Sequence, residues 1–182
     1  MAIWFHVTTV RGNPLGSGWA PGECIWSPSA NKRGSVAHYG IMLKARPGDK
    51  VIVCVNGDVC GVASVFTACK EVTSGPPERG AWSYARSFFR VELADYITFA
   101  TSVKLNIVAE KCKREIRQDM VKSRPKYYLY SRYPDGEFYP GGKLVLGQGR
   151  FLARATPVLI ESVKQCLSAK DQLHVPQAAS PA

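Results

Sequence analysis

The stretch DKVIVCVNGDVCGVASVF, residues 49–66, decides the fold. Two runs rich in β-branched residues flank Asn56-Gly57, the pair that best tolerates positive φ in a tight hairpin turn. The first run is apolar on both faces, which predicts a hairpin at the centre of a sheet rather than at its edge. Gly61, inside the second run, predicts a bulge or a close backbone approach, as a barrel corner or a ligand would require.

Short strands and two or three helices surround this hairpin. Strands are predicted over residues 4–9 and 87–93, and a strand, a turn-rich loop and another strand over residues 127–146. A helix is predicted over residues 35–45, where Val36, Tyr39 and Leu43 have helical spacing. A second is predicted over part of residues 101–120, from the spacing of apolar positions 105, 108, 112 and 116. A third is predicted from Pro157 to about Ala169, with Thr156 as its N-cap. This pattern indicates a mixed, barrel-like α+β domain.

The 182 residues have the length and composition of one globular domain, with 46% hydrophobic and 21% charged side chains. We expect this domain to occupy residues 1–168. Residues 169–182 are then a flexible tail or linker, because the last stretch is small, Pro-containing and aperiodic. No run approaches the roughly 18 apolar residues of a membrane span, and the N-terminal residues lack signal-peptide features, which favours the cytoplasm or the nucleus.

Positive charge is concentrated in two parts of the sequence. The net charge is +10, and residues 104–126 hold eight Lys or Arg against three Asp or Glu, a surplus of five. We expect Lys113, Arg114 and Arg117 in this stretch, and Lys32 and Arg33 in the other, to contact a nucleic-acid backbone. The alternative is a basic surface that aids solubility or a solvated helix face that binds nothing.

Groups suited to catalysis are sparse. The three histidines, His6, His38 and His174, have no nucleophile signature beside them, and no pair of the six cysteines forms a C-x-x-C motif. We interpret the cysteines as reduced, mostly buried small side chains, and we expect no catalytic residue, metal or cofactor. A hydrolase or transferase acting on nucleotides, with His6, His38 or a cysteine as catalytic group, is the alternative; an interaction module for another protein is a third.

Two segments place aromatic residues among turn formers. Trp26 lies in GECIWSPSANKRG, residues 22–34, and Trp82 and Tyr84 lie in PPERGAWSYARS, residues 76–87. We interpret Trp26 as exposed in a loop, where together with the second segment it forms an aromatic box for a nucleobase. The alternative is that these rings cap the open ends of a barrel core.

The residues also resemble a known family. CIWSPSANKRG followed by RPGDKVIVCVNGDVCGVASV is similar to the EVE and YTH-like branch of the PUA superfamily, and GKLVLGQGRFLARATPVLIESV is similar to the end of EVE domains. The likeness covers about residues 1–168. Because the first strand lacks the characteristic residues of the YTH branch, the EVE side is closer.

The resemblance implies a PUA-like mixed β-barrel flanked by helices, with a pocket for a modified base flipped out of nucleic acid. By position it assigns Trp26, Ser27 and Asn31 to that pocket, with Trp82 or Tyr84 as the second wall of an aromatic cage. It further implies a non-enzymatic reader of modified cytosine (5-methyl or 5-hydroxymethyl) in DNA, acting alone or with a nuclease subunit or fused nuclease domain in a restriction-modification system. A reader of methylated adenine in RNA is the other form that the family allows.

Overall fold

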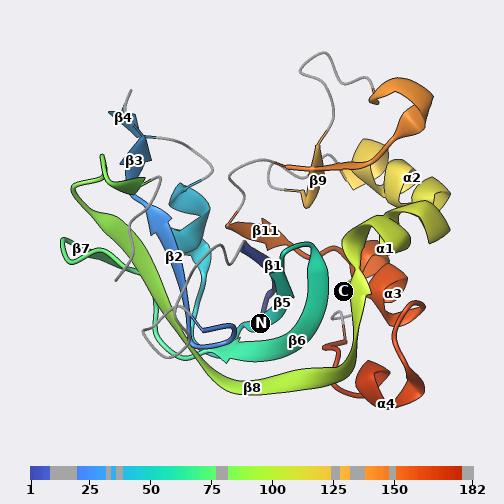
Figure 1. Cartoon of the computed structure of the whole chain (residues 1–182), viewed down its shortest axis with the longest axis horizontal. Helices are drawn as coiled ribbons and strands as arrows, with labels where there is room; N and C mark the ends of the chain where they lie inside the picture. Colours follow the sequence, from blue (N-terminus) through green and yellow to red (C-terminus); the bar gives the residue numbers. More distant parts are fainter. Residues whose placement is uncertain are drawn as a thin grey trace.

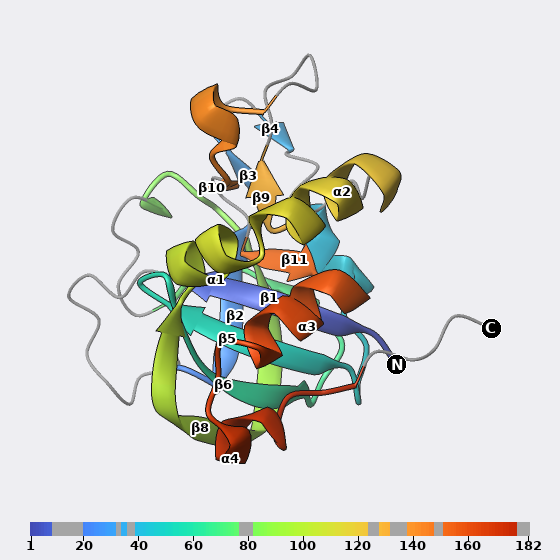
Figure 2. The same cartoon turned by 90° about the vertical axis from the view of Figure 1, so that its right-hand side faces the viewer.

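The computed structural model describes residues 1–8, 20–31, 34–35, 39–76, 82–123, 128–131, 138–147 and 151–177 (Figures 1 and 2). Its strands are β1 (Ile3–Thr8), β2 (Cys24–Pro28), β3 (Ala30–Asn31), β4 (Gly34–Ser35), β5 (Lys50–Val55), β6 (Asp58–Val65), β7 (Lys70–Val72), β8 (Phe88–Lys104), β9 (Tyr130–Ser131), β10 (Val145–Leu146) and β11 (Leu152–Arg154). Its helices are α1 (Leu105–Lys111), α2 (Lys113–Ser123), α3 (Pro157–Lys164) and α4 (Ala169–Gln172), with 3-10 turns η1 (Gly40–Lys44) and η3 (Pro140–Gly142).

The predicted α+β class is confirmed, with one mixed sheet as its main element. The strands follow the order β11-β1-β5-β6-β8-β2, and β7 pairs with β8. β1 runs parallel to β5, whereas the other pairs in this sheet are antiparallel. Figure 1 shows β6 and β8 curving together, so that the sheet curls into a half-barrel, and Figure 2 shows α1, α2 and α3 across one side of it.

The predicted hairpin is confirmed at the centre of this sheet. Asn56 and Gly57 form its turn with φ of 52° and 85°, and β5 lies between β1 and β6. Ile52 contributes to the core under the helices, whereas Val51 and Val53 contribute to the core on the other face. The first run is therefore apolar on both faces because the curled sheet buries both.

Gly61 makes the close approach that its position predicts. A Cβ at this position would lie 2.5 Å from the carbonyl oxygen of Ile97 and 2.6 Å from the ring of Tyr96. The register between β6 and β8 shifts at this point, and Asp95 in β8 has a φ of 53°. The lack of a side chain at Gly61 thus lets β8 bend closely over β6.

The helical segment after β8 follows the predicted rhythm. Apolar positions 105, 108, 112 and 116 are all buried, and the helix breaks at Cys112 into α1 and α2. The Thr156 hydroxyl caps α3 by accepting a hydrogen bond from the Leu159 N–H, as predicted. α3 ends at Lys164, short of the expected end at Ala169, because Ser168 caps a separate helix, α4.

Two local predictions are wrong. The segment around Tyr39 forms only the 3-10 turn η1, which buries Ile41 and Met42 and leaves Leu43 49% exposed; Val36 lies outside the described residues. Residues 24–28, expected in a loop, form strand β2. β2 lies at the end of the strand order, where a proline such as Pro28 is tolerated, and its pairing with β8 outweighs the turn-forming composition.

Within the described residues, no helix is both long and apolar enough to cross a membrane.

A buried carboxylate ties the start of the chain to the turn before β5. Asp49 is 4% exposed and accepts hydrogen bonds from the Ala2 N–H (2.7 Å), the Trp4 indole N–H (2.9 Å) and the Arg46 N–H (3.1 Å). Burial by itself would raise the pKa of this carboxyl, but the three donors favour the charged form and hold the pKa below its usual value.

We predict that Asp49→Asn lowers the free energy of unfolding by about 1–3 kcal/mol, because an amide NH₂ must then face a buried N–H donor. The carboxylate's contribution is fully present above its unfolded pKa, near 4, and is lost as the pH falls through the lower folded pKa. Urea unfolding between about pH 6 and pH 3 checks both effects. The parent should lose more stability over this range than the variant, and equal losses would contradict the role given to Asp49.

Candidate nucleic-acid interface

Trp26 lies in β2 and is buried, not exposed in a loop as expected. Its side chain is 4% exposed and meets Phe88 edge to face, with ring centroids 6.3 Å apart and planes at 84°. Arg90 of β8 is the residue that pairs with Trp26 across the two strands, and its guanidinium lies 4.9 Å from the Trp26 ring centroid. The same guanidinium forms an ion pair with the Glu92 carboxylate at 2.8 Å. Strand pairing thus places the ring in an aromatic cluster with a cation over it.

The second aromatic segment joins the same cluster. Trp82 packs against Phe88 at 6.4 Å and meets Phe151 edge to face at 5.2 Å. Tyr84 is half-buried in this cluster and hydrogen-bonds Tyr39, whose pKa is raised to about 12, first by burial and then by this bond. Two segments that the sequence singled out separately therefore meet around Phe88.

The polar residues assigned to the same pocket are less accessible. Ser27 is fully buried, and its hydroxyl donates to the Pro28 carbonyl at 3.3 Å. Successive side chains of a strand point to opposite faces, so Ser27 and Trp26 do not share a face of β2. Asn31 lies in β3, and its side chain is not among those that the structure describes. Lys32 and Arg33 lie outside the described residues.

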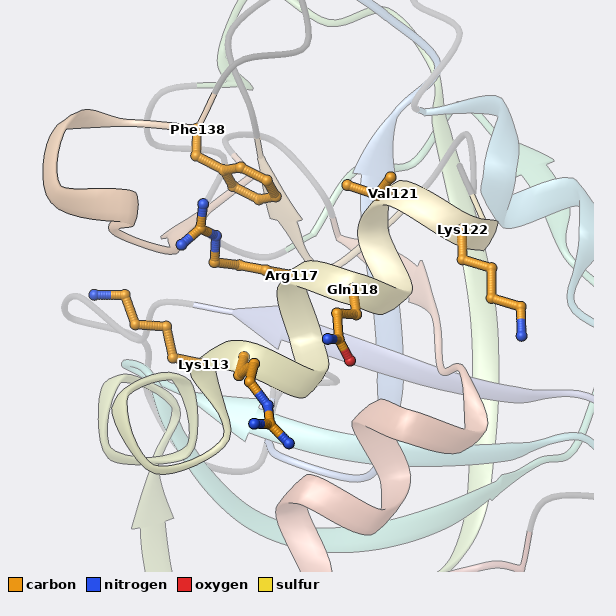
Figure 3. Close-up of a pocket in the computed structure, with 7 residues that line it drawn as sticks. Lys113, Arg117, Gln118, Val121, Lys122 and Phe138 are labelled. Carbon is orange, nitrogen blue, oxygen red and sulfur yellow. The ribbon is translucent and has the colours of Figure 1, made fainter.

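A groove of about 700 Å³ runs along α2 and brings together the three cations predicted there (Figure 3). Its lining consists of Lys113, Arg114, Arg117, Gln118, Val121, Lys122 and Phe138. Four of these seven side chains are cationic and none is acidic, so the described lining presents a strongly positive surface with an apolar part.

Contacts on both sides of α2 hold this groove in place. Towards the core, Asp119 accepts hydrogen bonds from the hydroxyls of Tyr128 (2.7 Å) and Thr156 (2.5 Å), which ties α2 to the start of α3. Towards the groove, the Arg117 guanidinium lies 4.4 Å from the Phe138 ring centroid, and Figure 3 shows the two side chains facing each other. The chain around η3 is thereby docked onto the helix.

Sequence reasoning missed four lining residues, of which three carried a readable signal. Positions 113, 117 and 121, and positions 114, 118 and 122, are spaced four apart, which places each trio on one side of a helix. That spacing would have added Gln118, Val121 and Lys122 to the patch. Phe138 had no local signal, because its contact with Arg117 depends on how a distant segment folds back.

Of the groups proposed for the alternative enzyme, His6, Cys24 and Cys69 have pKa values that burial shifts in favour of their neutral forms. The Nδ1–H of His6 donates to the Phe151 carbonyl at 2.8 Å, and burial lowers the pKa of this histidine to about 4. Burial also raises the pKa of Cys24 and Cys69 to about 11, so their thiols stay protonated and weakly nucleophilic. The described residues contain no group of three or more His, Cys, Asp or Glu that could hold a metal, and His38 lies outside them.

No protein-family profile matches the chain, and no curated protein matches it. Similar solved structures include the N-terminal domain of Staphylothermus marinus McrB, at 13% identity and a TM-score of 0.49, covering 90% of this chain and 93% of that one. A Pseudomonas putida protein solved by X-ray crystallography has 10% identity and a TM-score of 0.48, covering 91% of this chain and 99% of that one.

We predict that Trp26→Ala lowers the free energy of unfolding by about 3–5 kcal/mol, because it leaves a cavity between Phe88 and Arg90. Trp26→Phe should retain most of the stability, since a smaller ring still fills part of the space. Thermal and urea unfolding of both variants measure the effect. An alanine variant as stable as the parent would contradict the buried position of this ring.

Proposed function

We propose that this chain binds nucleic acid without altering it chemically and reads a modified base, most specifically a 5-methyl or 5-hydroxymethyl cytosine in DNA. The observation that carries the proposal is the groove along α2, where four cations and no acid line the same surface. A polyanion gains most from such a surface, because binding releases the counterions condensed on its phosphates. Contacts of this kind position the protein but carry no base information.

Base recognition is proposed at the aromatic cluster of Trp26, Trp82 and Tyr84, with Asn31 as a polar contact. Ser27 is left out of this site, because its side chain is fully buried and points to the opposite face of β2 from Trp26. This assignment is supported by the sequence resemblance to EVE domains and by the packing of the three rings in one cluster. The Trp26 ring is covered by Arg90. A base can therefore stack on Trp26 only after the guanidinium moves away, which also breaks its pair with Glu92.

Polar groups must supply most of the selectivity at this site. One additional buried methyl contributes only about 0.8 kcal/mol, roughly a fourfold preference. A hydroxymethyl group is distinguished more strongly where the site hydrogen-bonds it, because a base without it leaves a buried partner unpaired. Flipping the base out of a duplex costs a few kcal/mol more, which the phosphate contacts along α2 would offset.

A reader of this kind fits the recognition part of a restriction system, with a nuclease subunit or a fused nuclease domain as its partner. A single domain belongs to the same proposal, with its end placed after α4 rather than at residue 168, because the buried Asp171 carboxylate of α4 accepts hydrogen bonds from the Ala100 and Thr101 N–H groups of β8. In this arrangement the chain needs no metal or cofactor of its own.

We predict that neutralising Lys113, Arg114 and Arg117 to glutamine together weakens binding to modified and unmodified duplexes by the same factor and reduces its salt dependence. Phosphate contacts account for this, since they are blind to the base. Titrations at several salt concentrations measure it. The matched control neutralises Arg154, Lys164 and Lys170, which do not line the groove. If both triple variants bind alike, the groove along α2 is not the phosphate site.

Base selectivity is tested with duplexes that differ only in one base: cytosine, 5-methylcytosine, 5-hydroxymethylcytosine or N6-methyladenine. We predict the tightest binding to a modified cytosine, and a loss of that preference by about fivefold or more in Trp82→Ala, because a stacking wall is removed. Trp82→Phe should retain part of the preference. Equal affinity for all four duplexes would reject the reading of a modified base but not the binding of nucleic acid. A preference for the duplex with N6-methyladenine would reject cytosine as the recognised base and favour methylated adenine.

A further inference from the structure

The groove along α2 contains apolar surface that a phosphate backbone does not need. Val121 is 49% exposed on the helix, and Phe138 is half-buried opposite it. Figure 3 shows both side chains lining the same opening as Arg117. A duplex keeps its bases stacked inside and offers mainly its backbone, so apolar surface between cations favours a nucleotide whose base is unstacked.

Arg117 is closely packed by Phe138 and by Gly142. The Phe138 ring lies on one side of its guanidinium, at 4.4 Å, and the backbone of Gly142 lies close to the same group. A Cβ at Gly142 would come within 2.7 Å of an Arg117 Nη atom, and the φ of 67° at Gly142 also favours glycine. The Nε atom of Arg117 is buried and has no hydrogen-bond partner among the described residues. The contact with the Phe138 ring therefore helps to position the guanidinium, while Nε is left without a bonded acceptor in the part of the chain that the structure describes.

Two of the other three cations of the groove are partly engaged. Lys113 donates from Nζ to the Gly141 carbonyl at 3.1 Å, and Arg114 lies 3.7 Å from the Glu115 carboxylate. Arg117 has no acidic partner among the described residues. Of these three, it is the cation best prepared to hold an anionic group, because a planar guanidinium matches phosphate geometry.

We propose that this groove is a subsite for one unstacked nucleotide, with the phosphate on Arg117 and the base against Phe138 and Val121. The volume of about 700 Å³ lies within the usual range of about 300–1,000 Å³ for small-ligand sites. Gln118 adds an amide that can donate to and accept from a base edge. The inference rests on the proposed nucleic-acid function and deepens it: the chain binds single-stranded DNA here in addition to duplex.

The test compares an unmodified single-stranded DNA oligonucleotide with the duplex of the same sequence, by fluorescence anisotropy. We expect Phe138→Ala to weaken single-strand binding by about fivefold or more and Val121→Ser by about threefold, with duplex binding unchanged within about twofold. Gly142→Ala, which keeps every charge but crowds Arg117, should weaken binding to both forms. Ile107→Ser is the matched control, because Ile107 is similarly exposed, on α1, outside the groove.

Phe138 also packs against the core, so thermal unfolding is measured for each variant, and Val121→Ser provides the test if Phe138→Ala does not fold. If folded Val121→Ser binds both forms like the parent, or weakens both equally, the nucleotide subsite is rejected. The proposed function fails separately, if neutralising Lys113, Arg114 and Arg117 changes no binding at all. If a free mononucleotide displaces the oligonucleotide at concentrations below the oligonucleotide Kd, the groove is a site for a free nucleotide. That outcome would reject the proposal that the groove binds single-stranded DNA.

Discussion

The close packing of Tyr96 is the contact on which the rest of the structure depends. Its ring lies where a Cβ of Gly61 or of Gly22 would otherwise sit, so two positions without side chains make room for one aromatic. At this point β8 bends, which lets it pair with β6 over residues 93–104 and with β2 and β7 over residues 88–92. One strand thereby joins the central hairpin to the aromatic cluster, and the sheet curls.

The same bend separates the two candidate surfaces. The first half of β8 holds Arg90 over the Trp26 ring, whereas its far end leads directly into α1 and then to the groove along α2. In Figure 1, β2 lies on the left of the view and α2 on the right.

Buried groups with shifted pKa values and the cations that line the groove lie in different parts of the molecule. His6 and Cys54 are buried; burial lowers the pKa of His6 and raises the pKa of Cys54, so that the neutral form of each is favoured. The charged side chains that line the groove are cations on a helix face, held by stacking and backbone contacts.

The sequence by itself determined the features whose cause is local. Asn56-Gly57 specifies its turn through φ, the spacing of positions 105 to 116 specifies a helix, and Thr156 caps α3 through a neighbour three residues away. The cations of α2 were also predictable, because helical spacing places them together. Only the tertiary structure decided that Trp26 lies in a strand beneath Arg90 and that Phe138 stacks on Arg117. Both outcomes depend on contacts between residues far apart in the chain. Such contacts produce no periodic pattern of side chains within either segment, so neither segment alone predicts them.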